Sequence, residues 1–262
     1  MRNGVGALLF NAVFVAFIMM PILVVVLVSF TTKSYLALPW DGISLQWYRE
    51  LLRNRDFVAS LWVSLRLALV AASAAVLISL PAAFAIARHS FLGRRALSAF
   101  LLSPLMIPAV VLGIAFLRFL TLAGLSGTFL SLALCHVVLV TPFVLRLLLA
   151  ALTGFDRQVE RAAISLGADR ITLLRRITLP LLLPGIAGGW MLAFITSLDD
   201  LTVTIFVAPP ALTTLPVRVF NYIDQMTDPL VAAVSTALIV VTGGLMLLLD
   251  RVYGLDRLLV GR

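Results

Sequence analysis

Two adjacent carboxylates, Asp199 and Asp200, stand within an otherwise apolar stretch of the sequence. An acidic residue at the centre of a membrane helix costs about 2.5–3.5 kcal/mol on insertion scales, so it is expected to face water, a cation or a base. Neighbouring positions on a helix diverge by about 100°, and both side chains therefore cannot line one path equally. One interpretation is a path-lining acid that attracts ammonium groups, while its neighbour forms a pair or caps a break. The other is a buried ion pair, with Arg66 or Arg118 as the base.

The second concentration of polar residues is the connector from about Gly154 to Pro180. A connector of this length inside a compact membrane protein is usually functional. Glu160 lies in the first turns of a predicted helix, where the helix dipole favours negative charge. Gly167 permits a left-handed turn into a second short helix, which we expect Pro180 to end. The pattern indicates a helix-turn-helix that lies against the membrane and presents a protruding surface for a partner protein to bind. The alternative is a basic loop that only orients the chain.

Other chemistry finds little support in the sequence. No spaced set of His, Cys or carboxylate residues resembles a metal site, and no Ser-x-x-Lys or Gly-x-Ser-x-Gly suggests a hydrolase. The single cysteine, Cys135, cannot form a disulfide within the chain. We interpret His136 as a hydrogen-bonded contact between helices rather than a proton relay. The sequence therefore predicts no catalytic residue and no metal ligand, and we expect the protein not to be an enzyme.

The amino-acid composition indicates the class of protein whose helices must position these residues. Of the 262 residues, 62% are apolar and 12% are charged, against about 45–50% and about 25% in soluble domains. Too few polar side chains remain to cover a water-facing surface, which excludes a soluble globular, a disordered or a fibrous protein. The net charge of +8 is explained by the anionic inner face of a membrane, so we expect lipid and no nucleic acid as a partner.

We therefore predict an all-α, polytopic membrane protein that forms a single transmembrane domain over residues 1–262. A bilayer core about 30 Å thick needs roughly 20 apolar residues in a helix, and a barrel would show alternating segments instead. Six spans meet the length criterion, at about 6–30, 67–87, 96–117, 128–145, 181–207 and 229–249. The fifth span is expected to continue past Asp199 and Asp200. Because six is an even number, both ends of the chain lie on one side of the membrane, and the basic residues of the inner segments favour N-in and C-in.

The long connector contains Ala162-Ala163, then three residues, Gly167, nine residues, and Ile177, Leu179 and Pro180. At this spacing it resembles the EAA loop of ABC-transporter permeases, which reads Glu-Ala-Ala, three residues, Gly, nine residues, Ile-x-Leu-Pro. Arg161 occupies the position of the motif's Glu, and Glu160 comes one place earlier. The resemblance implies that loop 154–180 is a coupling helix docked in a cleft of a cytoplasmic ATPase, where Arg161 could meet an acidic spot. The coupling residues that it implies are Glu160, Arg161, Ala162, Ala163, Gly167, Ile177, Leu179 and Pro180.

The resemblance extends along most of the chain and is to permeases of the spermidine/putrescine transport group, which are type I importers. It is seen at Leu45–Tyr48, Ser60-Leu61, Pro81–Ala85, Ala87-Arg88, Ser197–Asp200, Thr214–Pro216 and Asp228-Pro229. It implies a type I ABC importer permease fold in the bacterial cytoplasmic (inner) membrane. It also implies three partners: a second permease, an ATPase dimer and an extracytoplasmic substrate-binding protein. The implied cargo is a polyamine or a related small amine-bearing solute, with Asp199 and Asp200 on the substrate path.

The sequence has no Gly-x-x-x-x-Gly-Lys-[Ser/Thr] phosphate-binding loop. We therefore expect no cofactor bound by this chain, with ATP-Mg held by the partner ATPase. One alternative is the same machinery for another solute, such as an amino acid, an opine, a phosphonate, iron or sulfate. A more distant alternative is a stand-alone secondary transporter, which predicts inverted repeats and ion sites near the midplane. No such repeat is visible in the sequence, and a docking loop would have no use there.

Overall fold

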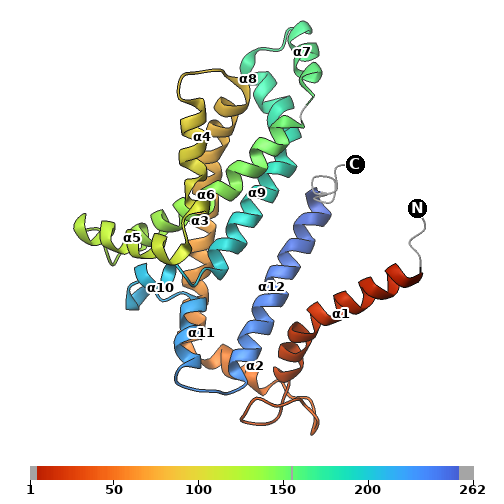
Figure 1. Ribbon diagram of the computed structural model, residues 1–262, viewed down its shortest axis with the longest axis vertical. Coiled ribbons are helices and arrows are strands. Elements are labelled where there is room, and N and C mark those ends of the chain that lie inside the picture. The colour runs from red at the N-terminus through yellow and green to blue at the C-terminus, as the bar shows by residue number, and fades with distance from the viewer. Residues whose placement is uncertain (1–4, 155, 254–262) are drawn as a thin grey trace. The chain divides into compact units, whose positions relative to one another are not determined.

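The computed structural model describes residues 5–154 and 156–253, and its ribbon is shown in Figure 1. Every regular element in these ranges is a helix, which confirms the predicted all-α class. Helices are favoured because each satisfies its backbone polar groups within one segment, as a lipid environment requires. The described residues divide into two compact units. The first unit contains 5–60 and 218–243, and the second contains the remainder of 61–253.

The first unit contains α1 (Val5–Val28), α2 (Gln46–Arg53), the end of α11 (Leu215–Ile223) and most of α12 (Leu230–Tyr253). The apolar side chains of α1 are largely exposed, as expected of a helix that lipid covers. The short helix α2 packs on the end of α1. The hydroxyls of Tyr48 and Ser29 lie 2.7 Å apart, and the rings of Tyr48 and Phe30 are 5.4 Å apart.

Tyr222 anchors the connection between α11 and α12 in this unit. Its hydroxyl donates a hydrogen bond to Asp228 at 2.6 Å, and its ring meets the edge of Phe57 at 5.3 Å. Burial raises the pKa of Tyr222, and the hydrogen bond to Asp228 raises it further. The phenol therefore stays a neutral donor. Nearby, Arg218 and Asp56 form an ion pair at 3.7 Å.

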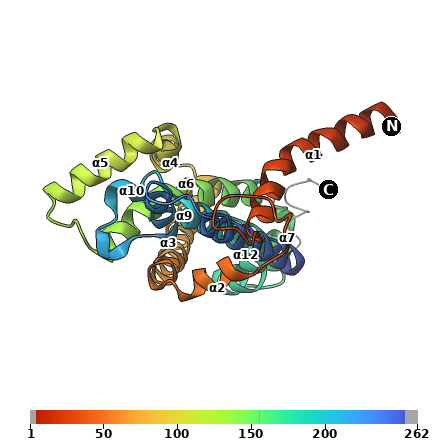
Figure 2. The ribbon, with the colours of Figure 1, turned by 90° about the horizontal axis from the view of Figure 1, so that it is seen from below.

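The second unit is built around α6 (Phe129–Thr153) and α9 (Leu179–Asp199), with α3 (Arg55–Arg88) against both. Both ribbon views place these three helices side by side (Figures 1 and 2). Small residues bring α6 and α9 close, because a Cβ at Gly185 would lie 2.6 Å from that of Ala151. The shorter elements of this unit are α4 (Arg94–Leu102), η1 (Ser103–Met106), α5 (Ala109–Leu122), α7 (Arg157–Ser165), α8 (Arg170–Leu173), η2 (Leu174–Thr178), α10 (Thr204–Val207) and η3 (Pro210–Leu212).

Five of the described helices are long and apolar enough to cross a membrane, and a sixth span results if one bent pair is counted together. That pair occupies the segment predicted as the third span, over 96–117. Its two parts, Arg94–Met106 and Ala109–Leu122, meet at an angle of 107°. The physical cause is Pro108, which lacks an N–H and disfavours helical backbone at Ile107. Ile107 is extended, with ψ 129°.

The fifth predicted span is also interrupted. Helix α9 ends at Asp199, and Asp200 is extended, with ψ 115°. The four-residue helix α10 then begins at Thr204. The expected continuation of one helix as far as Val207 is therefore replaced by a break at the acidic pair. Such a break exposes backbone groups, and the two carboxylates lie where those groups need partners.

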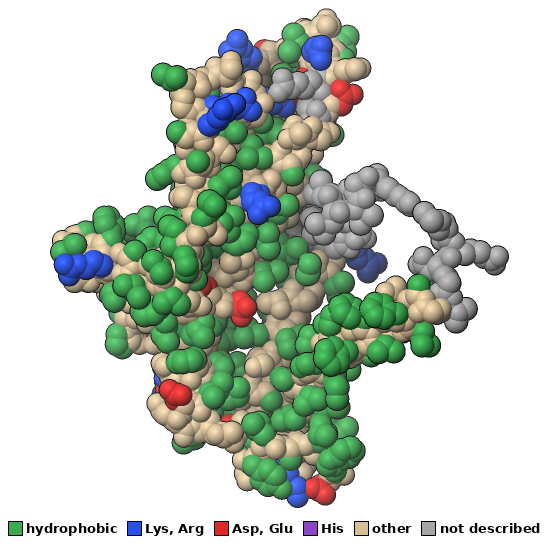
Figure 3. Space-filling view, viewed as in Figure 1, with side chains coloured by type: hydrophobic (Ala, Val, Ile, Leu, Met, Phe, Trp, Pro, Cys, Tyr) green, Lys and Arg blue, Asp and Glu red, His purple; other side chains and the backbone are tan. Residues whose placement is uncertain are grey.

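Basic side chains gather at one end of the second unit. Figure 3 shows arginine side chains over the region where α4 begins and α7 lies, while hydrophobic side chains dominate along the helices. Exposed arginines at this end include Arg94, Arg95, Arg161, Arg170 and Arg175. The end of α3, the start of α4 and the α7–α8 loop thus share one basic face.

Candidate coupling loop and acidic helix break

The loop before α9 has the predicted helix-turn-helix shape. The carboxylate of Asp156 caps α7 by accepting a hydrogen bond from the backbone N–H of Gln158 at 2.8 Å. The helix ends before Gly167, whose φ of +88° belongs to the left-handed region that glycine adopts without strain. Asp169 then caps α8 through the N–H of Ile171 at 3.2 Å. Both carboxylates at the helix starts are therefore engaged locally.

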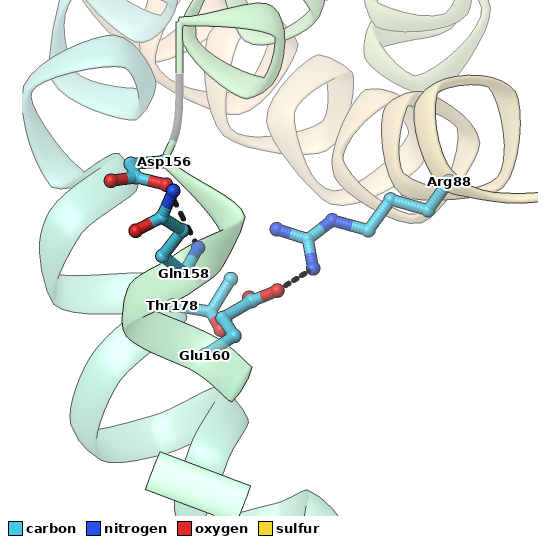
Figure 4. Close-up of polar contacts among 5 residues, drawn as sticks. All are labelled: Arg88, Asp156, Gln158, Glu160 and Thr178. Atoms are coloured by element: carbon cyan, nitrogen blue, oxygen red, sulfur yellow. Dashed lines mark hydrogen bonds and ion pairs between the residues drawn. The ribbon is translucent and has the colours of Figure 1, made fainter. Parts of the chain in front are cut away.

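Glu160 is buried and lies beside Arg88 and Thr178 (Figure 4). Its carboxylate accepts a hydrogen bond from the Thr178 hydroxyl at 2.6 Å and forms an ion pair with the guanidinium of Arg88. Arg88 is the last residue of α3 and also lies over the ring of Phe84, 5.4 Å from its centroid. Thr178 ends η2, the π-helical turn that leads into α9. One buried carboxylate thus connects α7 to both α3 and α9.

The predicted coupling residues separate into two groups on α7. Glu160 and Ala163 are buried on the same side, as residues three apart on a helix should be. Arg161 and Ala162 are exposed, and the exposed side chains of this region also include Ile164 and Leu166. A partner can therefore reach Arg161 and Ala162, whereas Glu160 and Ala163 serve the inside of the loop.

The C-terminal residues of the motif lie at the start of α9. Ile177 and Leu179 are partly buried, and Pro180 is exposed. The expectation that Pro180 ends the second helix is wrong, because helical structure runs from Arg170 to Asp199 without a gap. Pro180 occupies the first turn of α9, where proline is tolerated. The widened π-helical turn precedes it, where the missing N–H would otherwise have donated four residues back.

Sequence reasoning did not identify Arg88 and Thr178 as partners of Glu160. Arg88 was noted only as part of the Ala87-Arg88 pair at the end of a span. A usable signal was the displacement of the acid by one place from the motif. That displacement puts Glu160 on the side of Ala163 and Gly167, and a carboxylate on a buried side requires a base or a donor.

At the acidic break the two carboxylates have different surroundings. Asp200 accepts hydrogen bonds from the backbone N–H and the hydroxyl of Thr204, at 2.9 and 2.7 Å. It thereby caps the short helix α10. Asp199 is exposed. Among the residues that the structure describes, it forms no hydrogen bond or ion pair, and neither carboxylate pairs with Arg66 or Arg118.

His136 joins α6 to this break. It is fully buried, and its Nδ1 lies 2.8 Å from the Ser197 hydroxyl on α9. Its Nε2 lies 3.0 Å from the hydroxyl of Thr204 on α10. The imidazole is therefore a hydrogen-bonded contact between helices, as predicted from the sequence. The break, its cap and this contact together leave one exposed carboxylate at the end of a membrane helix.

Several long apolar helices, with a basic helix-turn-helix loop before the span at Arg170–Asp199, are the architecture of a polytopic membrane protein. The sequence profile of the family described as "Binding-protein-dependent transport system inner membrane component" matches residues 75–255. The chain belongs to that family, and it is a transmembrane permease subunit of an ABC importer.

Named relatives agree with this assignment. The chain is 36% identical over 239 residues to the spermidine/putrescine transport system permease protein PotC of Haemophilus influenzae, covering 91% of this chain and 93% of that one. It is 36% identical over 234 residues to the putrescine transport system permease protein PotI of Escherichia coli K12, covering 87% and 83%. Among solved structures, a bacterial ABC transporter that imports the acidic polysaccharide alginate matches with a TM-score of 0.75 at 16% identity, covering 95% of each chain.

Proposed function

We propose that this permease forms part of the translocation path for polyamines or a related small amine-bearing solute. The observation behind the proposal is the exposed carboxylate of Asp199 beside the anchored Asp200, at the point where α9 breaks. A carboxylate in a partly apolar path attracts an ammonium group and raises its local concentration. The named relatives transport spermidine or putrescine, which supports the same class of cargo here.

The proposal includes the partners that an importer of this family needs. A second permease completes the path, an extracytoplasmic binding protein delivers the solute, and an ATPase dimer holds ATP-Mg. The basic face around α4 and α7 would lie inside the cell, with N-in and C-in, because inner segments of membrane proteins are rich in arginine. In this arrangement the chain itself translocates solute and catalyses no reaction.

The α7–α8 loop is the proposed docking element for the ATPase. Arg161 and Leu166 are exposed on it, while its capping acids Asp156 and Asp169 are engaged with backbone N–H groups. Arg161 and Leu166 give this surface one basic and one apolar contact, and an acidic spot on the ATPase would complement Arg161. An Arg161→Glu variant should lose ATPase on purification, whereas Arg95→Glu, the same charge change on α4, should retain it. Equal recovery of ATPase with both variants would refute the docking proposal.

The substrate proposal is tested with the complete complex in proteoliposomes that contain ATP. Uptake of labelled putrescine and spermidine is compared with that of glutamate and alanine at equal concentrations. We expect ATP-dependent accumulation of the diamine or triamine and little accumulation of the amino acids. Preferential uptake of an amino acid or an anion would overturn the polyamine proposal and leave the importer class intact. Uphill uptake by this chain alone would overturn the proposed need for partners.

A further inference from the structure

A chain of hydrogen bonds runs from α6 through the break between α9 and α10. His136 contacts Ser197 before the break and Thr204 after it. Thr204 in turn contacts Asp200. His136, Ser197 and Thr204 are buried with at most 2% exposure. The buried imidazole therefore connects the end of α9 to the start of α10.

The direction of each hydrogen bond follows from the chemistry of the groups. A carboxylate can only accept, so the hydroxyl of Thr204 donates its one proton to Asp200. The Thr204 oxygen then accepts from the Nε2–H of His136. In the neutral imidazole, Nδ1 is then unprotonated and accepts from the hydroxyl of Ser197 at 2.8 Å. This order makes Nε2 the nitrogen that carries the hydrogen, and it uses every donor of the chain once.

Contacts on the other side of α10 limit how far it can move. A Cβ on Gly113 of α5 would lie 2.7 Å from the ring of Phe206 and 3.3 Å from the Cα of Val203. Helix α10 is therefore packed closely on α5 and hydrogen-bonded to α6. In this arrangement the carboxylate of Asp200 lies at the start of α10, and the exposed Asp199 lies at the end of α9.

We propose that His136 is a positioning residue for transport, which fixes the α9–α10 break and so holds the acidic pair in its solute-facing arrangement. The inference rests on the proposed function, because it gives the acidic pair a role toward a cationic solute. It adds a residue that touches neither the solute nor the ATPase. The feature that matters is the donor at Nε2, which orients Thr204 toward Asp200.

Two substitutions at the same position separate this role from mere packing. The amide of His136→Gln lies near the position of Nε2 and can still donate to Thr204. The amide of His136→Asn lies near Nδ1, where it reaches Ser197 but not Thr204. In the complete complex with putrescine as the probe, we expect the concentration for half-maximal uptake to rise about tenfold in His136→Asn, or ~1.4 kcal/mol. His136→Gln should restore a value close to the wild type, and maximal uptake should change little in either.

A milder pair keeps the test decisive if the substitutions at 136 prevent assembly. Thr204→Val has the same shape without the hydroxyl, and Thr204→Ser retains it. We expect Thr204→Val to behave as His136→Asn does, and Thr204→Ser to behave as the wild type does. The matched control is Thr141→Val on α6, which removes a buried hydroxyl that donates within its own helix, to the backbone oxygen of Val137 at 2.6 Å. Its half-maximal concentration should not change.

Exchange of backbone amide hydrogens is a second measurement, and it does not depend on the solute. The N–H of Thr204 donates to Asp200. Loss of the hydrogen bond between residue 136 and Thr204 should therefore speed exchange over 200–207 in His136→Asn but not in His136→Gln. Equal exchange in the two variants, or faster exchange with unchanged half-maximal concentration, would overturn the proposal. If putrescine is not taken up at all but exchange differs as expected, the proposed solute is wrong and the positioning contact is supported.

Discussion

The buried contact between Glu160 and Arg88 predicts a large effect from a small chemical change. The variant Glu160→Gln keeps the shape of the side chain and an oxygen that can accept from Thr178. It removes the negative charge that faces the guanidinium of Arg88 in the ion pair. The two side chains are only 9% and 19% exposed, so the relevant scale is that of buried pairs rather than of surface pairs. Breaking a buried pair costs about 3–5 kcal/mol.

Stability and coupling should both respond to this change. For a chain of this size, 1 kcal/mol corresponds to about 2–4 °C in the midpoint of thermal unfolding, and a loss of about 3 kcal/mol to about 6–12 °C. Because Glu160 joins α7 to α3 and α9, we also expect the number of ATP molecules hydrolysed per solute imported to rise. The assay is thermal unfolding of the purified complex, followed by parallel measurement of hydrolysis and uptake in proteoliposomes.

The control is an exposed ion pair between a basic and an acidic side chain. Lys33 and Asp41 lie 2.7 Å apart with both side chains well exposed, and Asp41→Asn should leave the unfolding midpoint and the coupling ratio unchanged. A double variant, Arg88→Met with Glu160→Met, removes both charges and should recover most of the lost stability. It should not recover coupling if the charge contact transmits motion. An unfolding midpoint for Glu160→Gln equal to that of the wild type would refute the reasoning.

Three further predictions concern separate parts of the second unit. Replacing Gly167 by Val places a β-branched residue at φ +88°, which should cost about 1–3 kcal/mol and uncouple hydrolysis from uptake; undiminished coupling would contradict the docking role of the loop. Replacing Gly185 by Val puts a Cβ 2.6 Å from that of Ala151, and the forced separation of α6 and α9 should cost about 1–3 kcal/mol in thermal unfolding; an unchanged midpoint would show that the two helices are not held at this distance. Asp199→Asn should reduce polyamine uptake with little change in stability, whereas Asp200→Asn should lower the unfolding midpoint because it weakens the cap of α10; the reverse pattern would assign the solute-facing role to Asp200.

The parts of the fold that could be predicted are those encoded locally. The apolar runs fixed the existence of the spans, because about 20 residues without charge have no stable alternative to a helix in lipid. The break at Pro108 was also accessible in principle, since a proline restricts the residue before it. The helix-turn-helix of the loop followed from Gly167, whose effect on the backbone reaches only a few residues along the chain.

Amino-acid order alone thus determined the membrane class, the loop and the acidic pair. The tertiary structure decided what each charged group does. Glu160 and Arg88 are 72 residues apart in sequence, and His136 and Thr204 are 68 apart, so no local pattern could pair them. The division between Asp199 and Asp200 likewise involves distant segments: Asp200 caps α10, and His136 of α6 contacts residues on both sides of the break. Long-range burial forces polar groups to find partners, and only the folded arrangement of helices determines which partners lie within reach.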